Sequence, residues 1–225
     1  MLAVIFAEVA AVFWIPIGIA VAVAVAAAGA ATALKVFGNK AKHAKVAVLG
    51  PRKAGKTTLG QFLESGTITA DYVASRGTEK HRGEILMKDL KLKVLFATPG
   101  GDKEQYAAWL ESAKSAKVVV FMFDLSRLNE KAYAKEALNG ARNIQNWVQT
   151  EALQTNTKII VVGTHRDQQP NGGHSNHFQQ TSNHPTVREI NRRLKPVESC
   201  YVSLIRPEGQ DNVLYTIGMA AGDRI

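Results

Sequence analysis

The chain divides into an apolar head and a body in which short apolar runs alternate with amphipathic stretches. Among residues 1–34 the only charged residue is Glu8, and the 26 residues of 9–34 carry no charge. A transmembrane helix needs about 20 mostly apolar residues to cross a hydrocarbon core of about 30 Å. We therefore predict a single transmembrane anchor in 1–34 and a basic juxtamembrane linker in 35–44.

The flanks of this apolar run predict its orientation. No Lys or Arg precedes it, whereas Lys35, Lys40, Lys42 and Lys45 follow it. The positive-inside bias then places the N-terminus outside and the body in the cytoplasm. These lysines either attract anionic lipid headgroups or only stop the transfer of the chain across the membrane during insertion. A cleaved signal peptide is the main alternative, but such peptides begin with basic residues and have a shorter apolar core. A buried hairpin of helices in a soluble domain is the second alternative.

The body, 45–225, alternates predicted strands with predicted helices. The strands are expected at 45–50, 84–90, 91–97, 117–124, 158–163 and 199–204, and the helices at about 56–65, 103–115, 130–153, 186–195 and 210–222. Valine-rich runs suit strands that are buried on both faces of a parallel sheet. The strands at 84–90 and 91–97 leave no room for a helix, so they form an antiparallel hairpin. We predict a three-layer α/β domain with a mostly parallel six-stranded sheet and one antiparallel strand.

Composition narrows the class of partner. The single cysteine, Cys200, excludes an intrachain disulfide and fits a reducing compartment. All 28 Lys and Arg and 18 of the 19 Asp and Glu lie in 35–225, which gives that part a net charge of +10. No basic patch interleaved with aromatic residues is present, so nucleic acid is not the expected partner. Anionic lipid or an acidic protein partner explains the charge more simply.

One motif carries specific chemistry. The segment 50–57, GPRKAGKT, matches G-x-x-x-x-G-K-[ST] at every fixed position and lies between a predicted strand and a predicted helix. Such a loop curls its backbone N–H groups around phosphate oxygens, its lysine reaches the β- and γ-phosphates, and its hydroxyl ligates magnesium. The residues assigned to phosphate binding are Gly50, Lys53, Ala54, Gly55, Lys56, Thr57 and Thr58.

With further motifs in the same order, the body resembles a Ras-like small GTPase. It is nearest to the Arf and Sar branch and to the membrane-anchored beta subunit of the signal recognition particle receptor. Thr78 resembles the switch I threonine, which senses magnesium and the γ-phosphate. The run 97–100, ATPG, stands where the family has D-x-x-G, so Gly100 resembles the switch II glycine. The resemblance implies GTP and GDP with Mg²⁺ as ligands, Thr57 and Thr78 as metal-binding residues, and Lys56, Thr78 and Gly100 as catalytic residues.

Two other segments resemble the guanine-binding motifs of that family. The run 164–167, THRD, stands where the family has [NT]-K-x-D, so Asp167 is expected to pair with guanine, beside Thr164 and with His165 lying over the base. A buried carboxylate facing adenine would stay unpaired, which is how such a site discriminates. The run Ser203, Leu204 and Ile205, followed by a G-x-D at 209–211, resembles the segment that completes the pocket.

The departures from the family pattern weaken the expected hydrolysis. Ala97 replaces the aspartate that holds a magnesium-bound water, and Gly101 stands where many relatives have the glutamine that orients the attacking water. Three basic residues cluster around Thr78, namely Arg76, His81 and Arg82. They either supply positive charge that compensates for the missing catalytic groups or lie on a solvated loop without a catalytic role. Asp102 or Asp124 is a possible substitute carboxylate, although Asp124 fits a turn cap better.

These patterns predict a membrane-anchored GTP-binding switch with slow hydrolysis, which regulates partner binding at the cytoplasmic membrane face. Two alternatives remain open. One is a constitutively GTP-bound scaffold, and whether the chain is an enzyme depends on this choice. The other is an ATP-dependent phosphoryl transferase, in which the 164–167 motif would have no role.

Overall fold

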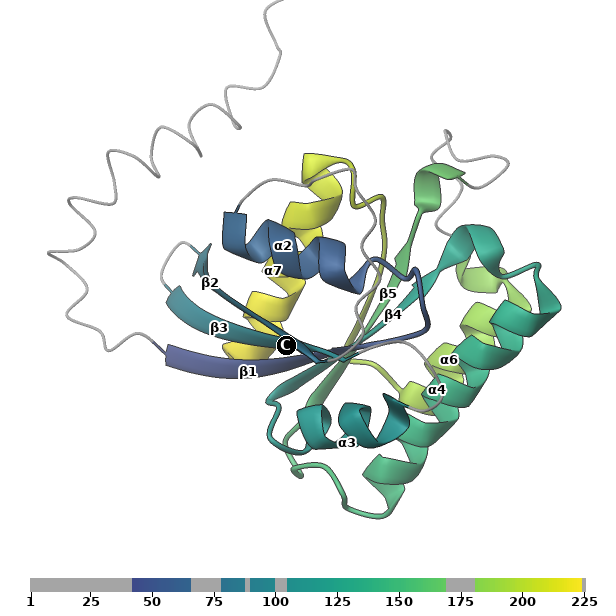
Figure 1. Cartoon of the computed structure of the whole chain (residues 1–225), viewed down its shortest axis with the longest axis horizontal. Helices are drawn as coiled ribbons and strands as arrows, with labels where there is room; N and C mark the ends of the chain where they lie inside the picture. The colour runs from purple at the N-terminus through teal and green to yellow at the C-terminus, as the bar shows by residue number, and fades with distance from the viewer. Residues whose placement is uncertain (1–41, 66–77, 88–89, 100–104, 169–180, 224–225) are drawn as a thin grey trace, which may run out of the picture. The chain divides into compact units, whose positions relative to one another are not determined.

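The computed structural model describes residues 42–65, 78–87, 90–99, 105–168 and 181–223, all within the compact unit Ala41–Ile225 (Figure 1). In the described residues no helix has the length and apolar character needed to cross a membrane. The anchor predicted in 1–34 lies outside the described residues.

A six-stranded sheet with the order β2-β3-β1-β4-β5-β6 forms the centre of this unit. The strands are β1 (Lys42–Leu49), β2 (Glu79–Met87), β3 (Leu90–Thr98), β4 (Val118–Asp124), β5 (Lys158–Thr164) and β6 (Glu198–Tyr201). Only the β2–β3 pair is antiparallel. The predicted six-stranded, mostly parallel sheet with one antiparallel member is confirmed.

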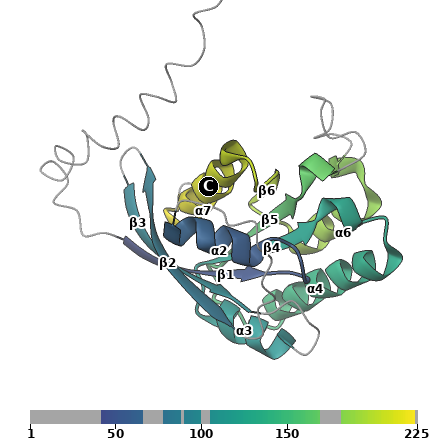
Figure 2. The ribbon, with the colours of Figure 1, turned by 45° about the horizontal axis from the view of Figure 1, so that its top comes forward.

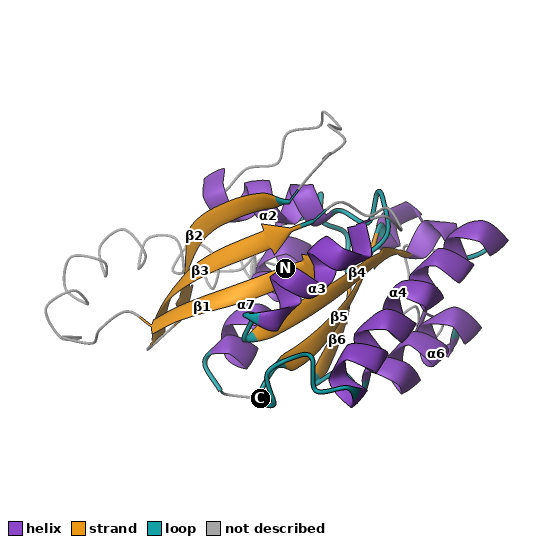
Figure 3. Ribbon diagram, turned by 60° about the horizontal axis from the view of Figure 1, so that its bottom comes forward, coloured by secondary structure: helices purple, strands orange, loops and turns teal. Residues whose placement is uncertain are grey.

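Helices cover both faces of the sheet, as Figures 2 and 3 show. They are α2 (Lys56–Ser65), α3 (Tyr106–Lys114), α4 (Lys131–Gln149), α6 (Pro185–Leu194) and α7 (Pro207–Ala221). Two short 3₁₀ turns, η2 (Leu125–Arg127) and η3 (Arg166–Gln168), follow β4 and β5. The three-layer arrangement confirms the predicted fold class.

The alternation of side chains along β1 builds the two cores. Val46 and Val48 join the cluster under α2 and α7, whereas Ala47 and Leu49 join the cluster under α3, α4 and α6. Successive strand residues point to opposite faces, so a strand covered on both sides must be apolar throughout. All seven residues of β4 are buried for this reason.

Several predicted boundaries were wrong. β1 begins at Lys42 instead of residue 45, so it includes the end of the predicted 35–44 linker, and β6 ends at Tyr201 instead of residue 204. β2 begins at Glu79 instead of residue 84, because its first residues pair with the end of β3, from Glu79 opposite Thr98 onward. α4 ends at Gln149 instead of 153, where Glu151 has a left-handed backbone with a φ of 54°. α7 begins at Pro207 instead of 210, at a first-turn position where the fixed φ of proline suits a helix.

Candidate nucleotide-binding site

The loop between β1 and α2 turns back on itself through three residues with positive φ. These are Gly50, Lys53 and Gly55, with φ values of 148°, 63° and 83°. A Cβ at Gly50 would lie 1.9 Å from the carbonyl oxygen of Met122 in β4. The first fixed glycine of the motif is therefore required both by its backbone conformation and by the close approach of β4.

Lys56 closes this loop from the first turn of α2. Its buried Nζ donates to the carbonyl oxygens of Gly50 and Pro51, both at 2.8 Å. The Leu59 N–H donates to the Gly55 carbonyl at 3.0 Å, so the helix starts directly at the loop. An ammonium at the mouth of a curled backbone, beside a helix N-terminus, is the arrangement that binds phosphate.

The loop lies at the topological switch point of the sheet. β1 is flanked by β3 on one side and by β4 on the other, and all three run parallel. Ligands of open α/β sheets bind at such a point, outside the carboxyl ends of the strands. The predicted guanine motifs follow β5 and β6, and those strands end at the same edge.

Thr164, the last residue of β5, joins the 164–167 motif to the phosphate loop. Its buried Oγ1 lies 3.1 Å from the carbonyl oxygen of Ala54 and 3.2 Å from that of Phe123. The single hydroxyl proton is shared between these two acceptors. His165 Nδ1 lies 2.9 Å from the same oxygen, and the tautomer of the ring sets which of the two atoms donates.

The 203–205 segment reaches the loop from the other side of β5. A Cβ at Gly55 would lie 2.9 Å from Cδ1 of Leu204 and 3.7 Å from Cγ2 of Thr164, so all three residues are packed together. Ser203 and Leu204 are buried, whereas Ile205 is 70% exposed. Among the groups that the structure describes, the buried Oγ of Ser203 has no hydrogen-bond partner, which leaves a polar atom at this end of the site.

Asp167 follows in the turn η3 and is partly exposed. The backbone here is fixed from two directions. His165 has a left-handed φ of 54°, and the Arg166 N–H donates to the Val202 carbonyl at 3.2 Å. The turn that carries Asp167 is thus held against the end of β6.

The switch residues are only partly within the described residues. Thr78 is exposed and immediately precedes β2. Ala97 in β3 lies between Lys80 of β2 and Ala47 of β1, and its side chain offers no ligand. Gly100, Gly101, Asp102 and Arg76 lie outside the described residues.

His81 and Arg82 do not lie in a loop, which corrects the predicted placement of these two residues, whereas Arg76 lies outside the described residues. Both lie in β2, where His81 faces α2 and Arg82 faces the opposite, exposed side. His81 is 8% exposed, and a Cβ at Gly60 of α2 would lie 2.2 Å from its ring. Its Nδ1 lies 3.1 Å from Oε2 of Glu64, and this close imidazole lowers the pKa of the Glu64 carboxyl.

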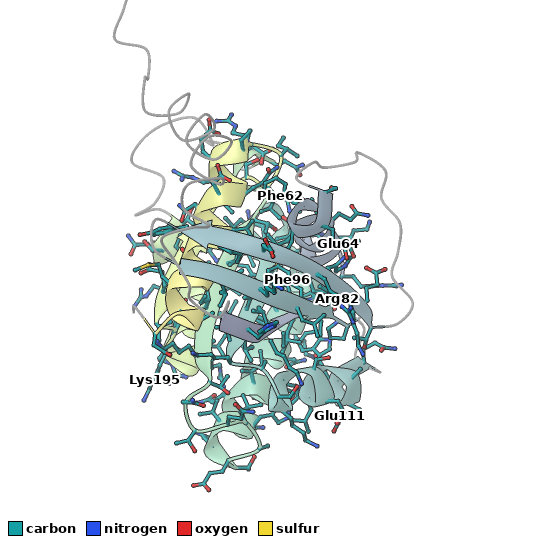
Figure 4. The ribbon with its side chains drawn as sticks, turned by 90° about the vertical axis from the view of Figure 1, so that its left-hand side faces the viewer. Phe62, Glu64, Arg82, Phe96, Glu111 and Lys195 are labelled. Carbon is teal, nitrogen blue, oxygen red and sulfur yellow. The ribbon has the colours of Figure 1, made fainter. Side chains whose placement is uncertain are left out.

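Figure 4 shows Glu64 of α2 above Arg82 of β2, where the Arg82 N–H donates to Oε1 of Glu64 at 3.1 Å. The C-terminal end of α2 is thereby fastened to β2. This contact matters for the site because the N-terminal end of α2 carries Lys56 and Thr57.

The sequence patterns missed Glu79, the first residue of β2. Its Oε2 lies 3.4 Å from Oγ1 of Thr57, the hydroxyl assigned to magnesium, and 3.5 Å from Nε2 of His81. The two residues are 22 positions apart, and no motif joins them. The signal available in the sequence was the position of Glu79 directly after Thr78.

Two other expectations are confirmed. Asp124 caps the turn after β4, since its Oδ1 accepts from N–H and Oγ of Ser126 at 2.9 and 2.6 Å. Cys200 is buried and packs in the core, and burial raises the pKa of its thiol.

A hollow of about 640 Å³ lies on the β1–β3–β2 part of the sheet. Among its lining residues are His43, Lys45, Arg82 and Lys93, and none comes from the phosphate loop. The site described above is therefore defined by its backbone geometry and contacts and not by this hollow.

Comparison with known families agrees with the geometry. The model of the ADP-ribosylation factor (Arf) family matches residues 30–215. The chain therefore belongs to the Arf family of small GTP-binding switch proteins, a Ras-like branch of the P-loop GTPases. A comparison with curated proteins finds no match.

Proposed function

We propose that this chain binds GTP and GDP at the phosphate loop and uses the bound nucleotide to control a partner at a membrane. The observation that supports this most strongly is the contact between Thr164 Oγ1 and the Ala54 carbonyl, which joins segments 110 residues apart. A phosphate loop alone suits any nucleoside triphosphate. Its contact with the turn that carries Asp167 favours guanine.

Each group has a distinct part in this proposal. Lys56 and the N-terminus of α2 bind the phosphates, and Asp167 pairs with the base. The hydroxyls of Thr57 and Thr78 are hard oxygen ligands of the kind that magnesium prefers, so the residues present fit the metal. Magnesium, when bound, neutralises phosphate charge. In this proposal the γ-phosphate of GTP orders the segments around Thr78 and Gly100, and loss of the γ-phosphate releases them, so a partner can distinguish GTP from GDP.

Membrane anchoring through 1–34 belongs to the proposal as well. The uncharged run at 9–34 and the lysines that follow it support a single-pass anchor with the GTP-binding domain in the cytoplasm. The test is extraction of the full chain from membranes. An anchored chain stays with the lipid in carbonate and high salt and is released by detergent, whereas release by salt alone contradicts an anchor.

The second candidate function is a scaffold that stays GTP-bound. Ala97 and Gly101 favour it, because neither side chain can hold a metal-bound water or orient an attacking one. Single-turnover phosphate release from the GTP-loaded full chain, with and without membrane extract, separates the two. A switch releases phosphate at about 10⁻⁴ s⁻¹ or slower alone and faster with a partner. No release under any condition supports the scaffold.

A further inference from the structure

This chain has Ala97 where the family has an aspartate, and the neighbouring strand holds a candidate replacement for the missing carboxylate. Glu79 Oε2 lies 3.4 Å from Thr57 Oγ1. In the β2–β3 ladder Glu79 lies opposite Thr98, one residue beyond Ala97, and Thr98 Oγ1 lies 3.4 Å from the Glu79 carbonyl oxygen. The acidic side chain thus comes to the same end of β3 from a different strand.

The spacing of the two oxygens suits a magnesium ion. Magnesium binds its oxygen ligands at about 2.1 Å in octahedral geometry, so neighbouring ligand oxygens lie about 3 Å apart. It is commonly held by one or two carboxylates together with substrate phosphates and water. A hydroxyl and a carboxylate 3.4 Å apart can therefore serve adjacent positions, directly or through one metal-bound water.

Neighbouring groups limit the position of the Glu79 carboxylate. His81 Nε2 lies 3.5 Å from the same Oε2 and its Nδ1 lies 3.1 Å from Oε2 of Glu64, but neither ring nitrogen has a hydrogen-bond partner among the described residues. The imidazole is packed against Gly60, so it has little freedom to turn. The hydrogen bond to Glu79 Oε2 comes from Thr57 Oγ1. Of the two substitute carboxylates considered from the sequence, Asp124 accepts from Ser126 through its Oδ1, and Asp102 lies outside the described residues.

We propose that Glu79 supplies the carboxylate of the magnesium site in this chain, in place of the aspartate that the family carries at position 97. This inference rests on the proposed binding of guanine nucleotide with magnesium. It places the metal-binding carboxylate on β2, directly after Thr78. Glu79 would then link the bound magnesium to the β2–β3 hairpin.

The test is the magnesium dependence of nucleotide release. The full chain in detergent micelles is loaded with a fluorescent GDP, and its dissociation rate is measured as Mg²⁺ is titrated from zero. We expect Glu79→Gln to need at least about tenfold more Mg²⁺ than wild type to slow nucleotide release. Mutation of groups that support a bound metal typically lowers metal affinity by about 10- to 100-fold. Glu84→Gln, on the exposed face of the same strand, is the control and should match wild type.

Rescue makes the test specific. Adding Ala97→Asp to the Glu79→Gln chain restores a carboxylate at the family position and should recover most of the magnesium response. An unchanged response in Glu79→Gln, or a loss that Ala97→Asp does not repair, overturns the inference. Glu79→Gln could also release nucleotide faster in the absence of Mg²⁺, and Glu79→Asp is then the deciding variant. Because aspartate keeps the carboxylate, Glu79→Asp should retain a magnesium response that Glu79→Gln lacks. Loss of the magnesium response to the same extent in both variants overturns the inference. Failure of wild type to bind guanine nucleotide at all contradicts the proposed function instead.

Discussion

Thr164 shows how one hydroxyl can join three segments of the chain. Its Oγ1 lies within hydrogen-bonding distance of the carbonyl oxygens of Ala54 and Phe123 and of Nδ1 of His165. The sequence suggested a guanine motif here, and the structure adds that the same residue holds the phosphate loop.

We expect Thr164→Val to destabilise the domain by about 1–3 kcal/mol, because it leaves buried carbonyl oxygens without their donor. Urea unfolding of the full chain in detergent measures this. Thr164→Ser keeps the hydroxyl and should lose less than half as much. A loss in Thr164→Ser as large as that in Thr164→Val would contradict a dominant contribution of the hydroxyl, because serine keeps the hydroxyl and lacks only the methyl group.

Asp167 provides the test of base recognition at the residue scale. Asp167→Asn replaces a carboxylate oxygen that accepts from guanine with an amide that donates. GTP should therefore bind at least about 100-fold more weakly, and xanthosine triphosphate more tightly. Competition against a fluorescent nucleotide measures both. Lys56→Ala, which removes the ammonium, should weaken both nucleotides alike. An Asn variant with unchanged preference contradicts the assignment of Asp167.

The elements show which features could be predicted from the pattern. The apolar runs of β4 and β5 were recognised because strands buried on both faces have no polar positions. The first half of β2 was missed because Lys80, Arg82 and Glu84 face outward and its inward residue is a histidine. No local pattern indicates that His81 is buried, since the glycine that makes room for it is 21 residues away in α2.

We expect Gly60→Ala to destabilise the contact between α2 and β2. The new Cβ would lie 2.2 Å from the His81 ring, and overpacking of this kind costs about 1–3 kcal/mol. The better helix propensity of alanine offsets about 1 kcal/mol of that cost. In thermal unfolding the double variant Gly60→Ala/His81→Ala should show no further loss beyond His81→Ala. Additive losses contradict a clash between these two residues.

The start of α6 predicts a pH effect. His184 Nδ1 accepts from the Thr186 N–H at 3.2 Å, which requires the unprotonated ring, and burial lowers the pKa of His184 below 6.5. A lowered histidine pKa means that this stabilisation is present above about pH 6.5 and is lost as the pH falls through the lower value in the folded state. We expect the cap to contribute up to about 1 kcal/mol.

The measurement compares unfolding free energies of wild type and His184→Ser between pH 7.5 and 5. Serine caps a helix without titrating, so the variant should gain relative to wild type as the pH falls. The other histidines are the same in both proteins, so their contribution to the pH dependence of the unfolding free energy cancels in this comparison. Parallel profiles would show that the ring nitrogen does not cap α6.

At the scale of the whole molecule, three sites distant in sequence converge on one edge of the sheet. The phosphate loop, the turn after β5 and the segment after β6 meet there because parallel strands end at the same side. Sequence patterns could place each motif on its strand and thereby predict this convergence. They could not place Glu79 beside Thr57, because that contact depends on the register of β2 against β3.

The most direct test of the central claim is equilibrium binding of nucleotides to the full chain in detergent with millimolar Mg²⁺. Fluorescent GDP is titrated first, and GTP and ATP then compete for it. The account predicts saturable binding that GTP displaces and that ATP displaces at least about 100-fold less well, because Asp167 stays unpaired against adenine. A folded chain that binds no nucleotide, or one from which ATP and GTP displace the label equally, contradicts it.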